Sequence, residues 1–238
     1  CGHRGGARAC GRALMSTPGF AIAPPAPADF SDVALTGVRL SEITLAPEQL
    51  LKEVDDSERA RAAAFRHEIH RLRFLQRRWW RRQVIAALAQ VEPGAVGCAH
   101  DELGQPRLVD PPAVRAWSLS TSHSEDLAVL AVSRSRPVGL DVAWMDPRHV
   151  SVDASRAFMC DGEFGAWQAM PDEDRVGCFF RWWARKEAVL KVVGTGFAIE
   201  PRRIDVRPAI VEVSGHGQVR VEDMAVVPGW AGAAAIAT

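Results

Sequence analysis

The feature that most constrains this chain is the stretch from Phe180 to Phe197, which combines helix-forming residues with a dense group of charges. It contains no helix breaker before Gly194, and glycine there suits the C-terminal end of a helix. Glu187 and Lys191 are spaced i and i+4, so a helix places both on one face. Lys186 lies about 100° around the helix from Glu187. One carboxylate flanked by two ammonium groups predicts either a surface ion pair or a site.

A second stretch, Arg136 to Trp144, has the composition of a β-strand with its apolar residues alternating onto one face. Asp141 falls on the other face, and a carboxylate in such a strand is costly unless it is paired or holds a cation. If Asp141 faces the helix, it and Glu187 supply two hard oxygen ligands, which suit Mg²⁺. Lys186 and Lys191 would then address phosphate oxygens. The pattern predicts a site that handles phosphate.

These two stretches resemble the paired signature of a known family. Gly139-Leu140-Asp141-Val142 together with Trp183 to Lys191 is similar to the signature of the 4′-phosphopantetheinyl transferases, in their larger two-lobed Sfp type. The similarity extends from about Glu48 to Val213. It implies an α+β fold made of two similar lobes related by a pseudo-twofold, each an antiparallel sheet packed against a long helix. We expect a disordered extension over 1–31, an N-terminal lobe over 32–136, and a C-terminal lobe over 137–238 that carries the metal and catalytic residues.

The resemblance also implies an activity. Such an enzyme transfers 4′-phosphopantetheine from coenzyme A to a serine of an acyl or peptidyl carrier protein and releases 3′,5′-ADP. Asp141 and Glu187 would hold Mg²⁺, and Glu187 would take the proton of the serine. Lys191 would stabilise the leaving phosphate, and Lys186 would orient a phosphate.

Further residues are implied to bind coenzyme A. Arg73, and less strongly Arg61, stand where the family has basic residues that meet the 3′-phosphate. Ser122 and His123 lie in a segment that looks like the family's Ser-His-Ser motif, whose hydroxyls and imidazole suit a pyrophosphate. A Ser–His pair is also found in hydrolases, but the chain has no Gly-x-Ser-x-Gly elbow around Ser122 or Ser124.

One departure from the family pattern concerns the metal. Most bacterial relatives have an acidic residue two positions after the strand aspartate, and this chain has Ala143 there. We therefore expect two protein carboxylates, unless Asp146, Asp153 or Glu163 substitutes. Downstream, residues 152–170 predict two helices, whose apolar set has either a core role or a role in gripping the carrier; these residues are Phe158, Phe164, Trp167 and Met170.

Composition bounds the alternatives. Lys and Arg number 29 against 29 Asp and Glu, so the total charge favours neither nucleic acid nor a membrane surface as a partner. The basic run from Arg66 to Arg82 nevertheless leaves a nucleic-acid-binding module open, against an amphipathic helix with its arginines in water. A coenzyme A-binding protein with a degenerate metal site is the other alternative. Five cysteines without a Cys-x-x-Cys spacing predict free thiols in a reducing cytoplasm. The resemblance to the two-lobed family implies a monomer.

Overall fold

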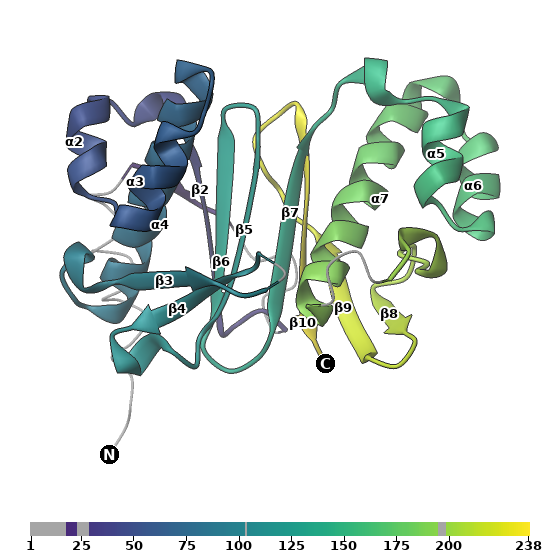
Figure 1. Cartoon of the computed structure of the whole chain (residues 1–238). Helices are drawn as coiled ribbons and strands as arrows, with labels where there is room; N and C mark the ends of the chain where they lie inside the picture. The colour runs from purple at the N-terminus through teal and green to yellow at the C-terminus, as the bar shows by residue number, and fades with distance from the viewer. Residues whose placement is uncertain (1–17, 23–28, 103, 195–198) are drawn as a thin grey trace.

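The computed structural model describes residues 18–22, 29–102, 104–194 and 199–238 of the chain. Its first half forms an N-terminal lobe with an antiparallel sheet in the order β1-β2-β6-β5. The strands of that sheet are β1 (Phe20–Ala21), β2 (Val33–Arg39), β5 (Ser118–Ser124) and β6 (Leu127–Ser133). The helices beside it are α2 (Pro47–Lys52), α3 (Asp56–Ala63) and α4 (Glu68–Ala89), and a hairpin follows them, β3 (Gly97–His100) and β4 (Pro106–Asp110). Figure 1 shows these helices on the outer side of the lobe.

The second half repeats this plan. Its sheet has the order β7-β10-β9-β8, with strands β7 (Val138–Trp144), β8 (Ile210–Val213), β9 (Gly217–Asp223) and β10 (Trp230–Ala237). Its helices are α5 (Val152–Phe158), α6 (Asp161–Gln168) and α7 (Asp172–Val193). In each lobe the last strand lies between a long early strand and the strand before it: β6 lies between β2 and β5, and β10 lies between β7 and β9. A 22-residue helix packs on each sheet. The predicted α+β class with two similar lobes is therefore confirmed.

Short 3-10 turns connect several of these elements; they are Leu40–Glu42, Pro93–Ala95, Pro112–Val114, Pro147–His149 and Pro201–Arg203. The chain passes from the first sheet to the second between Ser133 and Val138. Residues 204–206 follow the last of these turns and form no strand, because the backbone of Val206 bonds to the side chains of Glu163 and Arg185 instead. No helix within the described ranges is long and apolar enough to cross a lipid bilayer.

The ends of α7 follow local chemistry. Its first turn carries Asp172, Glu173 and Asp174, whose negative charges favour the N-terminal end of a helix. Its last residue is followed by Gly194 in the left-handed conformation, with φ 72°, and the Gly194 N–H bonds to the Leu190 carbonyl. The predicted helix end at Gly194 is confirmed.

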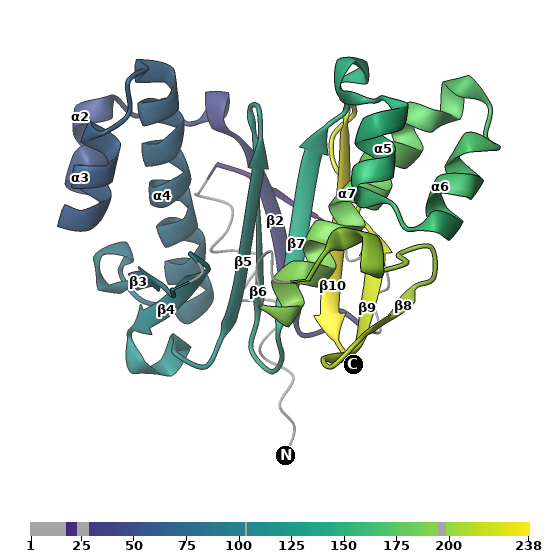
Figure 2. The same ribbon diagram turned by 45° about the vertical axis from the view of Figure 1, so that its right-hand side comes forward.

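The two sheets meet through side chains rather than through a backbone ladder. Strand β5 lies beside β7 (Figure 2), and every second residue of β5 is a serine whose hydroxyl accepts a backbone N–H of β7. The four bonds join Val138 to Ser118 (3.0 Å), Leu140 to Ser120 (3.0 Å), Val142 to Ser122 (3.3 Å) and Trp144 to Ser124 (2.9 Å). We call this set the serine ladder. It gives acceptors to N–H groups at the free edge of β7 and fixes the register of β7 against β5.

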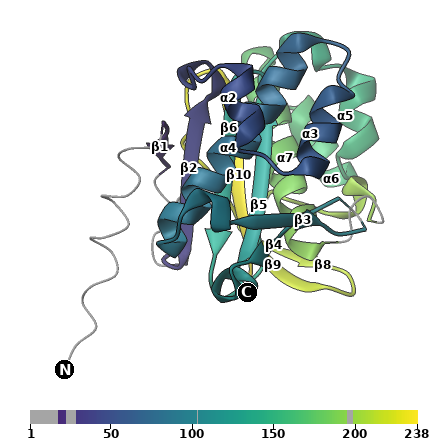
Figure 3. The same cartoon turned by 60° about the vertical axis from the view of Figure 1, so that its left-hand side comes forward.

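The N-terminal segment holds the back of both sheets together. Ile22 and Phe30 are buried in a cluster that contains residues of β6, β7 and β10, so one apolar core runs beneath both lobes. Asp29 pairs with Arg220 of the second lobe, and Figure 3 shows β1 at the outer edge beside β2. The prediction of disorder over 1–31 is therefore wrong for 18–22 and 29–31; residues 1–17 and 23–28 lie outside the described residues.

The apolar set of 152–170 is mostly core. Phe158 and Trp167 are 4% and 3% exposed, and both pack in the cluster that lies beneath α7. Phe164 and Met170 are partly buried against the same cluster. Packing therefore explains these residues, and the reading of them as a groove that grips a carrier is not needed.

Strand β7 and helix α7 touch closely at Gly139, on the strand face that also carries Asp141. A Cβ atom placed on Gly139 would lie 2.0 Å from the Ala188 carbonyl oxygen and 2.9 Å from the Val192 nitrogen. Only glycine allows this approach, because those neighbours are backbone atoms that cannot move aside alone. Gly139 thus sets the distance between the strand and the helix that carry the charged residues.

We predict that Gly139→Ala lowers the free energy of unfolding by at least about 3 kcal/mol, because the strand and the helix must separate to admit the methyl group. Urea denaturation followed by circular dichroism measures it. The matched control is Gly177→Ala within α7, where the added Cβ meets nothing within 4 Å and helix propensity should stabilise by about 0.5–1 kcal/mol. Equal stability of the Gly139→Ala variant and the parent protein would contradict the close packing.

Candidate active site

Asp141 lies in the middle of β7 and faces α7 from the strand side of the interface. Its side chain is 10% exposed, and its Oδ1 atom accepts two hydrogen bonds. Lys191 donates to Oδ1 at 2.8 Å and to the Leu140 carbonyl at 2.9 Å, and the Ser122 hydroxyl donates to the same Oδ1 at 2.6 Å. Asp141 therefore faces the helix, which is the condition that the metal hypothesis requires, and Lys191 is its ion-pair partner.

Glu187 lies one turn before Lys191 on α7, and its carboxyl group shares this space with Asp141. Burial raises the pKa of Glu187, the negative charge of Asp141 raises it further, and Lys191 opposes both effects. Within the described part of the chain no hydrogen bond or ion pair engages the Glu187 carboxylate. Two neighbouring carboxylates thus share a single ammonium group.

This donor set fits a divalent cation. Asp141 and Glu187 offer oxygen ligands, and their mutual repulsion is the condition that a Mg²⁺ ion would relieve. Ala143 lies further along the same strand, partly buried against the core of the second lobe, and adds no ligand. Asp141 and Glu187 are therefore the two residues that would hold the metal.

None of the three residues considered as a substitute ligand fills that place. Asp146 is bound by Arg148, which holds the pKa of Asp146 at about 2. Asp153 is exposed on α5. Glu163 is fully buried, and its two oxygens accept the N–H groups of Cys160 and Val206. The two-carboxylate prediction stands as it was made.

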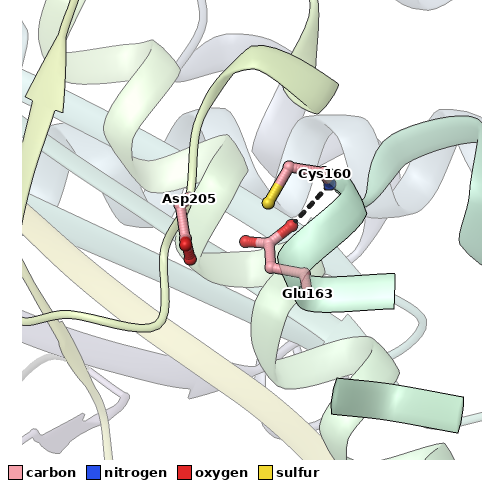
Figure 4. A group of neighbouring side chains, drawn as sticks. All are labelled: Cys160, Glu163 and Asp205. Atoms are coloured by element: carbon pink, nitrogen blue, oxygen red, sulfur yellow. Dashed lines mark hydrogen bonds between the residues drawn. The ribbon is translucent and has the colours of Figure 1, made fainter. Parts of the chain in front are cut away.

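Glu163 belongs to a second group of possible metal ligands, but its charge is already balanced by a lysine. Figure 4 shows Cys160, Glu163 and Asp205, whose ligand atoms lie within 4.8 Å of one another. The ammonium of Lys186 lies 2.8 Å from Glu163 Oε2 and also donates to the carbonyls of Pro201 and Ile204. Lys186 is therefore the cation of this group, and the group belongs to the packing between α6 and α7.

The same contacts correct the prediction made for Lys186. Its side chain is 2% exposed, and its ammonium is held by Glu163 and by the carbonyls of Pro201 and Ile204, so it is not free to bind a phosphate at the site. Burial lowers the pKa of Lys186, and the pairing with Glu163 opposes that effect. The expected catalytic and phosphate-binding role of Lys186 is wrong, because its partner Glu163 comes from α6, the preceding helix, and the spacing of charges within α7 does not reveal that partner.

The residues predicted to bind coenzyme A do not all lie at one site. The Ser122 hydroxyl donates its hydrogen bond to Asp141, so it positions that carboxylate and does not donate to a phosphate. His123, the next residue, is exposed beside α4, and Arg73 lies 3.6 Å from Glu125 in the following turn. Arg61 is exposed and lines a different cavity, between α3, α4 and the hairpin.

Sequence reasoning missed three arginines on α4 that turn inward. Arg77, Arg78 and Arg81 line a cavity with His123, and Arg81 is 3% exposed. The amphipathic helix was predicted correctly, but its arginines were expected in water, whereas Arg81 and Arg82 are buried on Glu58. The helical spacing gives a signal for this burial, because it places Arg81 and Arg82 on the same side of α4 as its buried apolar residues.

Comparison with known proteins agrees with this geometry. Residues 137–220, which run from β7 through α7 into β9, match the model of the 4′-phosphopantetheinyl transferase superfamily. The 4′-phosphopantetheinyl transferase HetI of Nostoc sp. is 31% identical over 173 residues, which cover 68% of this chain and 73% of that protein. This chain belongs to the 4′-phosphopantetheinyl transferase superfamily.

Other members of the superfamily match at similar levels. A phosphopantetheinyl transferase of Thraustochytrium sp. is 29% identical over 213 residues, covering 85% of this chain and 73% of that protein. The Sfp protein of Bacillus subtilis is 25% identical over 141 residues, covering 59% and 58%. The resemblance drawn from the sequence is confirmed, and the region matched by the superfamily model contains Asp141, Glu187 and Lys191.

We predict that Lys186→Met lowers the free energy of unfolding by about 3–5 kcal/mol, because the Glu163 carboxylate is then left buried without its cation. Denaturant titration measures the loss. Adding Glu163→Gln to the same chain should recover part of it, whereas a loss under about 1 kcal/mol for the single variant would mean that Lys186 is not a structural ion-pair partner.

A second prediction concerns pH. The folded protein raises the pKa of Glu187 above that in the unfolded chain, so ionised Glu187 opposes folding at neutral pH. The penalty is absent below the unfolded pKa, where both states are protonated. Without metal, Glu187→Gln should therefore unfold at a higher temperature than the parent at pH 7, and the gap should close near pH 3.

Thermal unfolding at both pH values checks this, with Glu212→Gln, an exposed acid on β8, as the matched control. A variant that is less stable than the parent at pH 7 would contradict the direction of the shift.

Proposed function

We propose that this protein transfers 4′-phosphopantetheine from coenzyme A to a serine hydroxyl of an apo carrier protein and releases 3′,5′-ADP. The observation that carries the proposal is the convergence of Asp141, Glu187 and Lys191 at the contact of β7 with α7. Membership of the superfamily supports the reaction class. Both reaction partners follow from it: coenzyme A as donor and an acyl or peptidyl carrier domain as acceptor.

The reaction has clear requirements. The oxygen of the carrier serine forms a bond to the β-phosphorus of coenzyme A, and the bond from that phosphorus to the bridging oxygen of the pyrophosphate breaks. The serine loses a proton, and the leaving 3′,5′-ADP gains negative charge. A site for this chemistry needs a base, a cation near the leaving phosphate, and compensation for the pyrophosphate charge.

The residues present match these needs. Glu187 accepts the serine proton, and a raised pKa brings a carboxylate closer to the strength of a useful general base. Lys191, whose side chain is 27% exposed, is held by Asp141 with its ammonium near the site and stabilises the leaving phosphate. Ser122 keeps Asp141 oriented. When Mg²⁺ is bound by Asp141 and Glu187, it neutralises charge on the pyrophosphate oxygens.

The proposal extends to assembly and pathway. Both lobes come from one chain, and the serine ladder joins them, which supports a monomer. We propose a cytoplasmic enzyme that acts on carriers of fatty-acid, polyketide or nonribosomal-peptide synthesis. The free thiols Cys98, Cys160 and Cys178, none in a disulfide within the described ranges, are in keeping with a reducing compartment.

The proposal is tested by the intact mass of a panel of apo carrier domains after incubation with the protein, coenzyme A and Mg²⁺. We expect the mass of one phosphopantetheine on at least one carrier and none with a chelator present. Asp141→Asn and Glu187→Gln should each slow the transfer by about 10²-fold or more, because each removes a charged group from the reacting centre.

Glu173→Gln is the control and should keep the parent rate. No modification of any carrier, with coenzyme A still bound, would instead identify a coenzyme A-binding protein with a degenerate metal site. In that case Ala143→Glu is the change to test for restored transfer. Parent-like rates in Glu187→Gln at saturating Mg²⁺ would remove Glu187 from the roles of base and ligand.

A further inference from the structure

The turn between β3 and β4 brings a side chain of the N-terminal lobe to α7 in the other lobe. The side-chain amide of Gln105 donates from Nε2 to the carbonyl oxygen of Lys191 at 3.4 Å. The same amide lies against Gly194, where an added Cβ would be 3.7 Å from Gln105 Oε1. The hairpin therefore contacts the C-terminal end of α7, in addition to the contact that the serine ladder makes between the two sheets.

The carbonyl that accepts this bond is one for which the helix itself supplies no donor. The last four carbonyls of an α-helix have no N–H group within the helix to bond to. Helix α7 ends at Val193, so Lys191 carries one of these four carbonyls. The carbonyl before it, on Leu190, accepts the Gly194 N–H at 3.0 Å. Gln105 gives the Lys191 carbonyl a donor from the opposite lobe.

The backbone of Gln105 is fixed on both sides by Asp101. The Gln105 N–H donates to Asp101 Oδ1 at 2.8 Å, and the Gln105 carbonyl accepts the Asp101 N–H at 3.0 Å. Arg107 pairs with the other oxygen of the Asp101 carboxylate at 3.2 Å. Gly104 has φ 81°, a left-handed conformation that glycine adopts without strain. The turn therefore presents the Gln105 amide to α7 from a defined position.

Lys191 is held at the end of its side chain as well as at its backbone. Its ammonium donates to Asp141 Oδ1 at 2.8 Å and to the Leu140 carbonyl at 2.9 Å, both on β7. A lysine side chain has many rotamers, so a bond to the ammonium alone leaves the rest of the residue free to shift. With its carbonyl bound by Gln105 and its ammonium bound by β7, Lys191 has a defined place at the site.

We propose that Gln105 is a positioning residue, which holds the last turn of α7 from the N-terminal lobe and so keeps the Lys191 ammonium in place for the leaving phosphate. The part that concerns the phosphate rests on the proposed function. Among the described residues no hydrogen bond joins Gln105 to Asp141 or Glu187, so its effect passes through Lys191. Stabilisation of developing charge depends on where the cation lies, so a displaced ammonium slows the chemical step.

The variant to make is Gln105→Met, which keeps the length of the side chain and removes the donor. We expect kcat for the transfer to fall about three- to tenfold, with KM for coenzyme A within about twofold of the parent. Gln218→Met makes the same exchange at an exposed position on β9 and is the matched control, which should keep the parent kcat. A parent-like kcat in Gln105→Met, or a higher KM with kcat unchanged, would overturn the positioning role.

A double variant shows whether the effect passes through Lys191. In a chain that already carries Lys191→Met, adding Gln105→Met should change the remaining rate by less than about twofold, because the ammonium that Gln105 positions is gone. If the two substitutions instead slow the transfer independently, so that their fold-losses multiply, Gln105 acts on another group and the proposal is wrong.

Hydrogen exchange tests the contact separately from the reaction. Amide exchange followed by mass spectrometry should be faster over residues 186–194 in Gln105→Met than in the parent, and unchanged in Gln218→Met. Exchange equal to that of the parent would refute the contact, whether or not the protein modifies a carrier. Faster exchange in a protein that modifies no carrier would refute the proposed function and the role at the phosphate, while the hold of Gln105 on α7 would stand.

Discussion

The structure depends on the serine ladder between β5 and β7. Each serine of β5 offers a hydroxyl oxygen to an N–H that β7 would otherwise leave unpaired at its edge. Side-chain acceptors let the two sheets meet without forming one continuous backbone ladder. The register is fixed at the same time, because each hydroxyl reaches one particular N–H. The lobes therefore hold a defined relative position, which a site between them requires.

One rung of this ladder also belongs to the site. The Ser122 hydroxyl oxygen accepts a hydrogen bond from the Val142 N–H, and the same hydroxyl donates one to Asp141. Asp141 is held in turn by Lys191 from α7, so strand, helix and neighbouring lobe are tied at one carboxylate. Gly139 allows this by letting β7 approach the α7 backbone. These contacts set the geometry of Asp141, Glu187 and Lys191. All three residues lie on a strand or a helix.

The sequence could predict α7, its end at Gly194, and the meeting of Asp141 with Glu187, because each depends on local periodicity or chain order. It could not separate Lys191 from Lys186, since both flank Glu187 and both suit a phosphate. What separates them is Glu163, a fully buried carboxylate on α6 that captures Lys186. Such a pairing depends on how two helices pack, and spacing along the chain carries no record of it.

Strand β5 explains how two sites of opposite charge lie so close together. Alternation along the strand turns Ser122 toward β7, where two carboxylates share one ammonium, and leaves His123 on the side of α4, where the arginines exceed their carboxylate partners. Consecutive residues thus border a site with surplus negative charge and a cavity with surplus positive charge. The two carboxylates raise each other's cost of ionisation, and a divalent cation at Asp141 and Glu187 would relieve that repulsion. The arginine side of β5 would attract an anion without a metal, whereas the carboxylate pair would repel one until a metal is bound.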